Sequence, residues 1–228
     1  MKILHIIPAA FEYFEDVKKV AFRIVESQNE VGAHADAFAL QYSSHDISAE
    51  NQKNKNKFTK AMMDKNAGRS AKFPTIEYKG LQAIDKSISC FNDYDIVHLH
   101  TPFFGAGRKI LKWKKLNPDK KFVISFYVDF KSKDLFSFFI KLYNSYYLPR
   151  LFKIADLLIG LEEESFFQTF AHHYVDDFDK MVFMIDKDSV DYSKLTIKEN
   201  GVKLSSEEFA KTLAERMIVT YQKLLINN

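Results

Sequence analysis

The sequence predicts an α/β fold with a Rossmann-like, doubly wound and mainly parallel sheet. Three observations support this. Short apolar runs alternate with segments of helical periodicity, as in chains of βα units. The first three elements form a strand, a helix and a strand. The chain has 228 residues, 46% of them hydrophobic, which is enough to build a sizeable core.

The first βαβ unit is the clearest. Lys2 to Pro8 is a short, Ile-rich apolar run that predicts a buried strand. Residues 15–30 carry apolar side chains at helical spacing, and Gly32 is placed to end that helix. Ala35 to Gln41 then predicts a second strand. We therefore expect these two strands to be parallel and joined by a right-handed crossover.

The rest of the chain continues this alternation after one interruption. Residues 43–72 are polar and rich in Lys and Asn, and predict a mobile insertion with a short helix at 57–65. Ser205, Ser206 and Glu208 predict a capping box at the start of a C-terminal helix. Further strands are expected at 96–99, 122–126, 157–160 and 181–185, and further helices at 80–91, 105–116, 133–153, 162–172 and 205–226.

Composition excludes several classes of protein. The net charge of +3 is weak, and no basic stripe with interleaved aromatics resembles a nucleic-acid module, so no nucleic-acid partner is expected. The single cysteine, Cys90, excludes an intramolecular disulfide and favours a reducing, cytoplasmic setting. The N-terminal apolar run is too short for a signal peptide. The 22 Phe and 11 Tyr fit either core filling or a surface that faces carbohydrate or lipid.

Several local motifs, in order, resemble the N-terminal, acceptor-side domain of the family 4 glycosyltransferases of the GT-B fold. The most specific is DYDIVHLHTPF, Asp93 to Phe103, which is similar to the family's D-I-V-H-x-H element beside the crevice. The opening 40 residues resemble the first strand, helix and turn. KIADLLIGLEEESFFQTF and DKMVFMIDKDSVDYSKL resemble a later strand–helix unit and the linker strand.

The resemblance covers residues 1–192, which we take as one glycosyltransferase-like N-terminal domain. Residues 193–228 are expected to be a linker and a helix that packs back on that domain, similar to the family's last helix. The family's C-terminal domain, which holds the nucleotide-sugar with a Glu-x7-Glu element, has no counterpart in the sequence. A partner chain that carries the donor domain, or a partner glycosyltransferase, is therefore expected.

The resemblance points to three candidate sites. The loop after the first strand carries a Gly pair in the family, whereas FEYFEDV has none. Glu15 and Asp16 stand there as candidate substrate-binding residues. They suit the helix dipole, so ordinary capping is the simpler alternative, and they would repel a diphosphate.

The second site is ISFYVDF, Ile124 to Phe130. Tyr127 replaces a family His that contacts the reacting sugar, and Tyr is a poor proton shuttle near neutral pH. Asp129 could bind an acceptor hydroxyl or act as a base, with a structural turn as the alternative. Tyr127 and Asp129 are the candidate catalytic residues, and this site leans toward a lost catalytic group.

The third site is HLHTPF. The resemblance makes His100 and Thr101 candidate substrate-binding residues at a strand end, while His98 is expected to point into the sheet packing. A satisfied structural role is the alternative for His100. His172 and His173 have no third ligand at useful spacing and read as helix-end or surface residues. No metal and no cofactor are expected, because the GT-B fold relies on helix dipoles and basic side chains.

Residues 131–153 interleave basic and aromatic residues, which suits an anionic membrane surface, and residues 108–121 add further Lys and Arg around Trp113. The alternative is a helix with one buried face and one solvated basic face. The expected location is cytoplasmic, including the inner face of the membrane, with a lipid-linked or carbohydrate acceptor.

The leading functional hypothesis is a glycosyltransferase-like half-domain in polysaccharide or glycoconjugate assembly at the cell envelope. It would transfer sugar from a nucleotide-sugar only together with a donor-domain chain. The alternative is a pseudoenzyme, a non-catalytic domain that binds and stabilises or regulates a true transferase. A self-sufficient small transferase is the third interpretation.

Overall fold

The computed structural model describes residues 1–8, 15–39, 41–42, 77–78, 88–103, 107–127, 140–185, 195–198, 201–204 and 207–226. The expected insertion at 43–72, its short helix, Asp129 and the two capping serines lie outside these residues. So do most of the expected helix at 80–91 and the first part of the one at 133–153.

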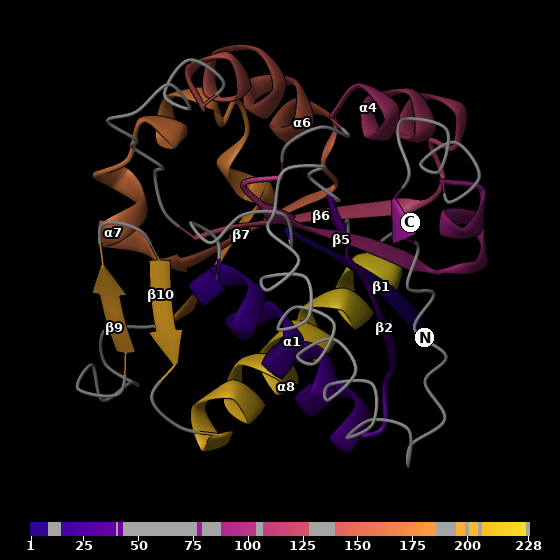
Figure 1. Cartoon of the computed structure of the whole chain (residues 1–228), viewed down its shortest axis with the longest axis vertical. Coiled ribbons are helices and arrows are strands. Elements are labelled where there is room, and N and C mark those ends of the chain that lie inside the picture. The colour runs from indigo at the N-terminus through magenta and orange to yellow at the C-terminus, as the bar shows by residue number, and fades with distance from the viewer. Residues whose placement is uncertain are drawn as a thin grey trace, which may run out of the picture.

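A single six-stranded sheet forms the centre of the fold (Figure 1). All of its strand pairs are parallel, and the strand order is β2-β1-β5-β6-β7-β8. This confirms the predicted α/β, Rossmann-like class. The strands are β1 Lys2–Ile7, β2 His34–Ala39, β5 Ile96–Thr101, β6 Lys121–Phe126, β7 Leu157–Glu162 and β8 Met181–Ile185.

The strand order reverses between β1 and β5. From β1 the chain goes to β2 on one side, and every later strand of this sheet is added on the other side, starting with β5. In open α/β sheets the crossover connections on the two sides of such a point leave in opposite directions, and ligands bind at the carboxyl ends of the strands there. The register places His5 of β1 beside His98 of β5.

Helices α1 (Glu15–Glu30) and α8 (Glu207–Ile226) cover one face of the sheet and lie side by side, as Figure 1 shows. The helical spacing predicted for α1 is confirmed, since Val17, Val20 and Ile24 are all buried against the sheet. Gly32 ends this unit with φ of 90°, a left-handed conformation that a residue with a Cβ adopts at a cost.

Helices α4 (Gly107–Leu116) and α6 (Leu148–Ile154) cover the opposite face. Trp113 packs between Phe91 and Phe122 and donates a hydrogen bond to Asn92 Oδ1 at 2.9 Å. Lys114 is buried but fully used: its Nζ donates to two backbone carbonyls and to Asp156 Oδ2. A π-helical turn, η3 (Tyr143–Tyr147), leads into α6.

The helix expected at 162–172 is wrong in its length. Helix α7 covers only Glu163–Phe167, because Thr169 is extended and its hydroxyl caps a separate 3₁₀ turn, η4 (Phe170–Tyr174). The linker expected after residue 192 contains an antiparallel hairpin. The remaining elements are η2 Ser89–Asp93, η5 Phe178–Lys180, the hairpin β9 Leu195–Lys198 and β10 Gly201–Leu204, and the parallel pair β3 Gln41–Tyr42 and β4 Glu77–Tyr78.

Candidate functional site

Polar side chains interrupt the apolar face that the sheet presents to α1 and α8. Alternate residues of a strand point to the same face, so His5 follows Ile3 and precedes Ile7 on β1, and His98 and His100 follow Ile96 on β5. Ser125 and Tyr127 follow Val123 in the same way. All five polar residues are buried, and the three imidazoles have no exposed surface.

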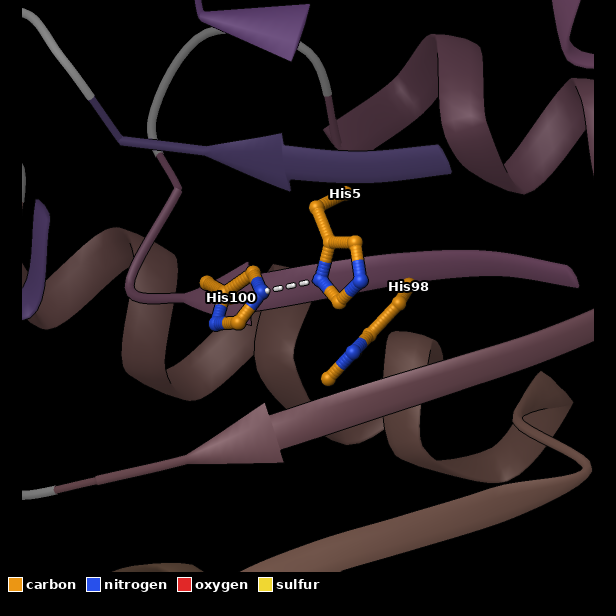
Figure 2. A group of neighbouring side chains, drawn as sticks. All are labelled: His5, His98 and His100. Atoms are coloured by element: carbon orange, nitrogen blue, oxygen red, sulfur yellow. Dashed lines mark hydrogen bonds between the residues drawn. The ribbon is translucent and has the colours of Figure 1, made fainter. Parts of the chain in front are cut away.

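The rings of His5 and His100 form the centre of a hydrogen-bonded chain (Figure 2). His5 Nδ1 and His100 Nε2 are 2.9 Å apart. At one end, His5 Nε2 lies 2.8 Å from Gln28 Oε1, which α1 supplies. At the other end, His100 Nδ1 lies 2.5 Å from the hydroxyl of Tyr127, the residue that follows β6. The chain thus runs from α1 to the carboxyl end of β6.

His98 forms a second, shorter chain beside the first. Its Nε2 lies 2.7 Å from Ser125 Oγ, and its Nδ1 lies 2.6 Å from the hydroxyl of Tyr221 on α8. The rings of His98 and His100 stack with their centroids 4.3 Å apart. The C-terminal helix is therefore tied to the central strand by a buried polar contact as well as by apolar packing.

Burial keeps all three imidazoles neutral near pH 7. Burial lowers the pKa of His5 to about 4, although the hydrogen bond to Gln28 acts in the opposite direction. Burial, and then the proximity of the other imidazoles, lowers the pKa values of His98 and His100 well below 6.5. Burial also raises the pKa of the Tyr127 hydroxyl, partly offset by a hydrogen bond from Ser125.

The three histidines are also the group in the described residues that could hold a metal ion, since one nitrogen of each lies within 4.8 Å of the others. Two observations disfavour this. Each of the six ring nitrogens already has a hydrogen-bond partner. His100 also stacks on the other two rings at about 30°, so the in-plane lone pairs of these rings do not converge on one point. The arrangement fits a satisfied hydrogen-bond network.

The structure brings together three of the residues expected at the site. His100 and Tyr127 are hydrogen-bonded, and Thr101 lies next to them with its hydroxyl donating to Ser125 O at 2.9 Å. Glu15 and Asp16 begin α1, but their side chains are outside the described set, as is Asp129. The roles predicted for these six residues stay predictions.

His98 was expected to point into the sheet packing and His100 toward a ligand at the strand end. This difference between the two side chains is wrong. Both side chains lie on the same face of β5, because they are two residues apart, and both are fully buried. His172 and His173 lie in η4, where their rings are 3.8 Å apart and His173 is exposed.

Four members of the network were not expected from the sequence: His5, Gln28, Ser125 and Tyr221. A signal existed for His5, which is the only polar residue in the run ILHII and has the same alternation as His98 and His100. Gln28 and Tyr221 look like ordinary polar positions of amphipathic helices, and only the packing of α1 and α8 on the sheet reveals their role.

Among the described residues, no helix has both the length and the apolar composition needed to cross a bilayer. No protein-family model matches the sequence, and no curated protein matches it.

Solved structures show distant likeness. An S. aureus MnaA–UDP structure aligns with a TM-score of 0.48 at 13% identity, over 84% of this chain and 50% of that one. An α-glucosyltransferase in complex with UDP aligns with a TM-score of 0.45 at 14% identity, over 82% of this chain and 41% of that one. An α-glucosyltransferase in complex with UDP and a 13-mer DNA containing an HMU base aligns with a TM-score of 0.44 at 14% identity, over 75% of this chain and 38% of that one. The chain thus spans half or less of these structures, and the likeness is too distant to argue an activity.

Proposed function

We propose that this chain is a glycosyltransferase-like, acceptor-side half-domain that works with a partner chain carrying the donor-binding domain. One observation carries the proposal: Tyr127, joined to His100, follows a strand end beside the point where the strand order reverses. Ligands of open α/β sheets bind there. The reaction would be sugar transfer from a nucleotide-sugar to a hydroxyl acceptor, as the motifs around His100 suggest.

The described strand ends fit an acceptor better than a donor. A nucleotide diphosphate needs backbone N–H groups at a helix N-terminus or cationic side chains. The described residues that directly follow β1, β5 and β6 are Pro8, Pro102, Phe103 and Tyr127, and none of them carries a positive charge. The neutral hydroxyl of Tyr127 instead suits a sugar or other hydroxyl-bearing ligand.

A surface of α4, η3, α6 and the helical residues 140–142 before η3 supports a second part of the proposal, a peripheral contact with an anionic membrane that carries a lipid-linked acceptor. Basic and apolar side chains lie together there, and the Arg150 guanidinium stacks 3.7 Å from the centre of the Tyr146 ring. Such a mixture suits the headgroup region. The exposed members are Arg108, Lys112, Lys115, Leu116, Lys141, Leu142, Tyr146 and Lys153. Flotation with phosphatidylglycerol and with phosphatidylcholine vesicles tests the contact, which should need the anionic lipid.

Calorimetric titration of the purified chain with a panel of nucleotide-sugars and free nucleotides tests the half-domain. We expect no saturable heat up to about 1 mM ligand, which corresponds to binding weaker than about −4 kcal/mol. Micromolar binding by the isolated chain would contradict the half-domain and favour a self-sufficient transferase.

The alternative, a non-catalytic domain that stabilises a true transferase, is separated by variants of the assembled pair. Asp129→Asn and His100→Asn should abolish transfer if this chain supplies the acceptor site. Transfer that survives both, with the pair still assembled by size-exclusion chromatography and folded by circular dichroism, would favour the non-catalytic role.

A further inference from the structure

A methionine sulfur determines the orientation of the Gln28 amide. Gln28 Nε2 lies 4.0 Å from Met217 Sδ on α8. A thioether only accepts hydrogen bonds, so the amide end that faces it is the NH₂ group. The carbonyl oxygen Oε1 therefore faces His5, at 2.8 Å from Nε2. Gln28 also acts on the hydroxyl of Tyr221, whose pKa is raised by burial and lowered in part by a hydrogen bond from Gln28.

The position of every proton in the chain follows from this orientation. His5 Nε2 must carry a proton, because Gln28 Oε1 only accepts. A neutral imidazole has one N–H, so His5 Nδ1 is an acceptor and His100 Nε2 donates to it at 2.9 Å. His100 Nδ1 is then an acceptor as well, and the Tyr127 hydroxyl donates to it at 2.5 Å. All three donors thus point from the strand end toward α1.

A tyrosine alone is a poor proton shuttle near neutral pH, but Tyr127 is hydrogen-bonded to His100, which can accept its proton in the same step. We propose that Tyr127, His100 and His5 form a proton relay that lets Tyr127 Oη take up the proton of a ligand hydroxyl bound at the carboxyl end of β6. The inference rests on the proposed function, in which such a hydroxyl attacks a nucleotide-sugar. Because the Tyr127 proton points inward and Ser125 donates to Oη, one lone pair of Oη remains to accept from a ligand. The relay thus selects a ligand group that donates a hydrogen bond.

The transfer balances without any further reactant. The ligand O–H bond breaks and its proton goes to Tyr127 Oη, while the Tyr127 O–H bond breaks and its proton goes to His100 Nδ1. The Nε2–H bond of His100 breaks and its proton goes to His5 Nδ1. The ligand oxygen keeps the electron pair and becomes the nucleophile. His5 becomes an imidazolium that donates to Gln28 Oε1 and to His100 Nε2.

The first test locates the protons in the unmodified chain. Long-range ¹H–¹⁵N correlation spectra distinguish protonated from unprotonated ring nitrogens. At pH 7 we expect His5 and His100 to be neutral and both protonated at Nε2. A His100 ring protonated at Nδ1, or a charged His5 or His100, would overturn the relay.

The second test places the charge at the inner end. Gln28→Glu puts a carboxylate where His5 Nε2 donates, which favours the imidazolium form of His5. One opposite charge raises an imidazole pKa by about 1 to 3. Near pH 5, where the His5 ring of the unmodified chain is still largely neutral, His5 of the variant should therefore be protonated at both nitrogens, and His100 should move its proton from Nε2 to Nδ1. The other side chains around Gln28, His5 and His100 are those of His98, Ser125, Tyr127, Met217 and Tyr221.

A doubly protonated His5 donates from Nδ1, so His100 Nε2 must then accept. The switch at His100 therefore shows that the two rings can exchange donor and acceptor roles along their hydrogen bond, which the relay requires. A His100 ring that keeps its proton on Nε2 in Gln28→Glu would refute the proposal. The control is Gln168→Glu, which adds the same charge at an exposed residue and should leave the spectrum as in the unmodified chain. Neither spectrum depends on transferase activity, so the proposed function can fail while the relay stands.

Discussion

Acidification should destabilise the chain through its buried imidazoles, and His5→Gln isolates one of them. The pKa of His5 is lowered from 6.5 to about 4 by burial in the folded chain, whereas the unfolded chain keeps the ordinary value. At 1.36 kcal/mol per pH unit of difference, His5 alone removes about 3 kcal/mol of unfolding free energy. Between pH 6.5 and 4 only the unfolded chain binds this proton, so stability is full above about pH 6.5 and falls as the pH is lowered toward 4.

Urea titrations followed by circular dichroism at pH 7.5, 6.5, 5.5 and 4.5 measure this dependence. His5→Gln should begin less stable at pH 7.5, since it disrupts a buried network, but should lose about 3 kcal/mol less than the unmodified chain by about pH 4. Titration of the surface carboxylates is common to both proteins and cancels in the comparison. His173→Gln is the matched control at an exposed ring. If the unfolding free energy of His5→Gln fell as steeply with pH as that of the unmodified chain, the electrostatic reasoning would be refuted.

Three other predictions concern packing and metal. Lys114→Met leaves Asp156 and two carbonyls without their buried donor, and should lower the unfolding free energy by about 2 to 4 kcal/mol, against little change for exposed Lys112→Met, by urea titration. Gly160→Ala should cost about 1 to 3 kcal/mol, seen in thermal melts, because the added Cβ would lie 2.7 Å from the Phe183 ring; an unchanged melt would contradict this close approach. Added zinc or EDTA should leave the melting midpoint unchanged; a rise with zinc would instead reveal three-histidine coordination.

The sheet could be predicted from sequence because its strands are parallel and covered on both faces. Such strands appear as nearly continuous apolar runs, and the runs at Met181 to Ile185 and Lys2 to Pro8 match β8 and β1 within one residue. Helix boundaries were less predictable. The periodicity of 162–172 continues through Thr169, where the side chain prefers to cap the next turn rather than continue the helix.

The network could be predicted only in part, because it depends on register. The alternation within β5 shows that His98 and His100 share a face, and that of β1 places His5 on a buried face. His5 aligns with His98 across the two strands. Nothing in the sequence shows this, because the two residues are 93 positions apart. The hairpin of β9 and β10 was missed because its alternating residues, LTIK and GVKL, lie in a segment that reads as a linker.

The contact between Tyr221 and His98 implies an order of events during synthesis. The strands β1 to β8 and helix α1 leave the ribosome before α8, so the strands can pair while the part of the sheet face that α8 covers is still open. The bonds that close the network join residues 123 and 189 positions apart. Contacts of such sequence separation form late, since loop closure must precede them. A nascent chain stalled before α8 emerges would therefore expose the apolar residues that α8 covers, and His98 would lack its tyrosine partner. Chaperones bind exposed apolar surface, so we expect them to bind this state more than the complete chain.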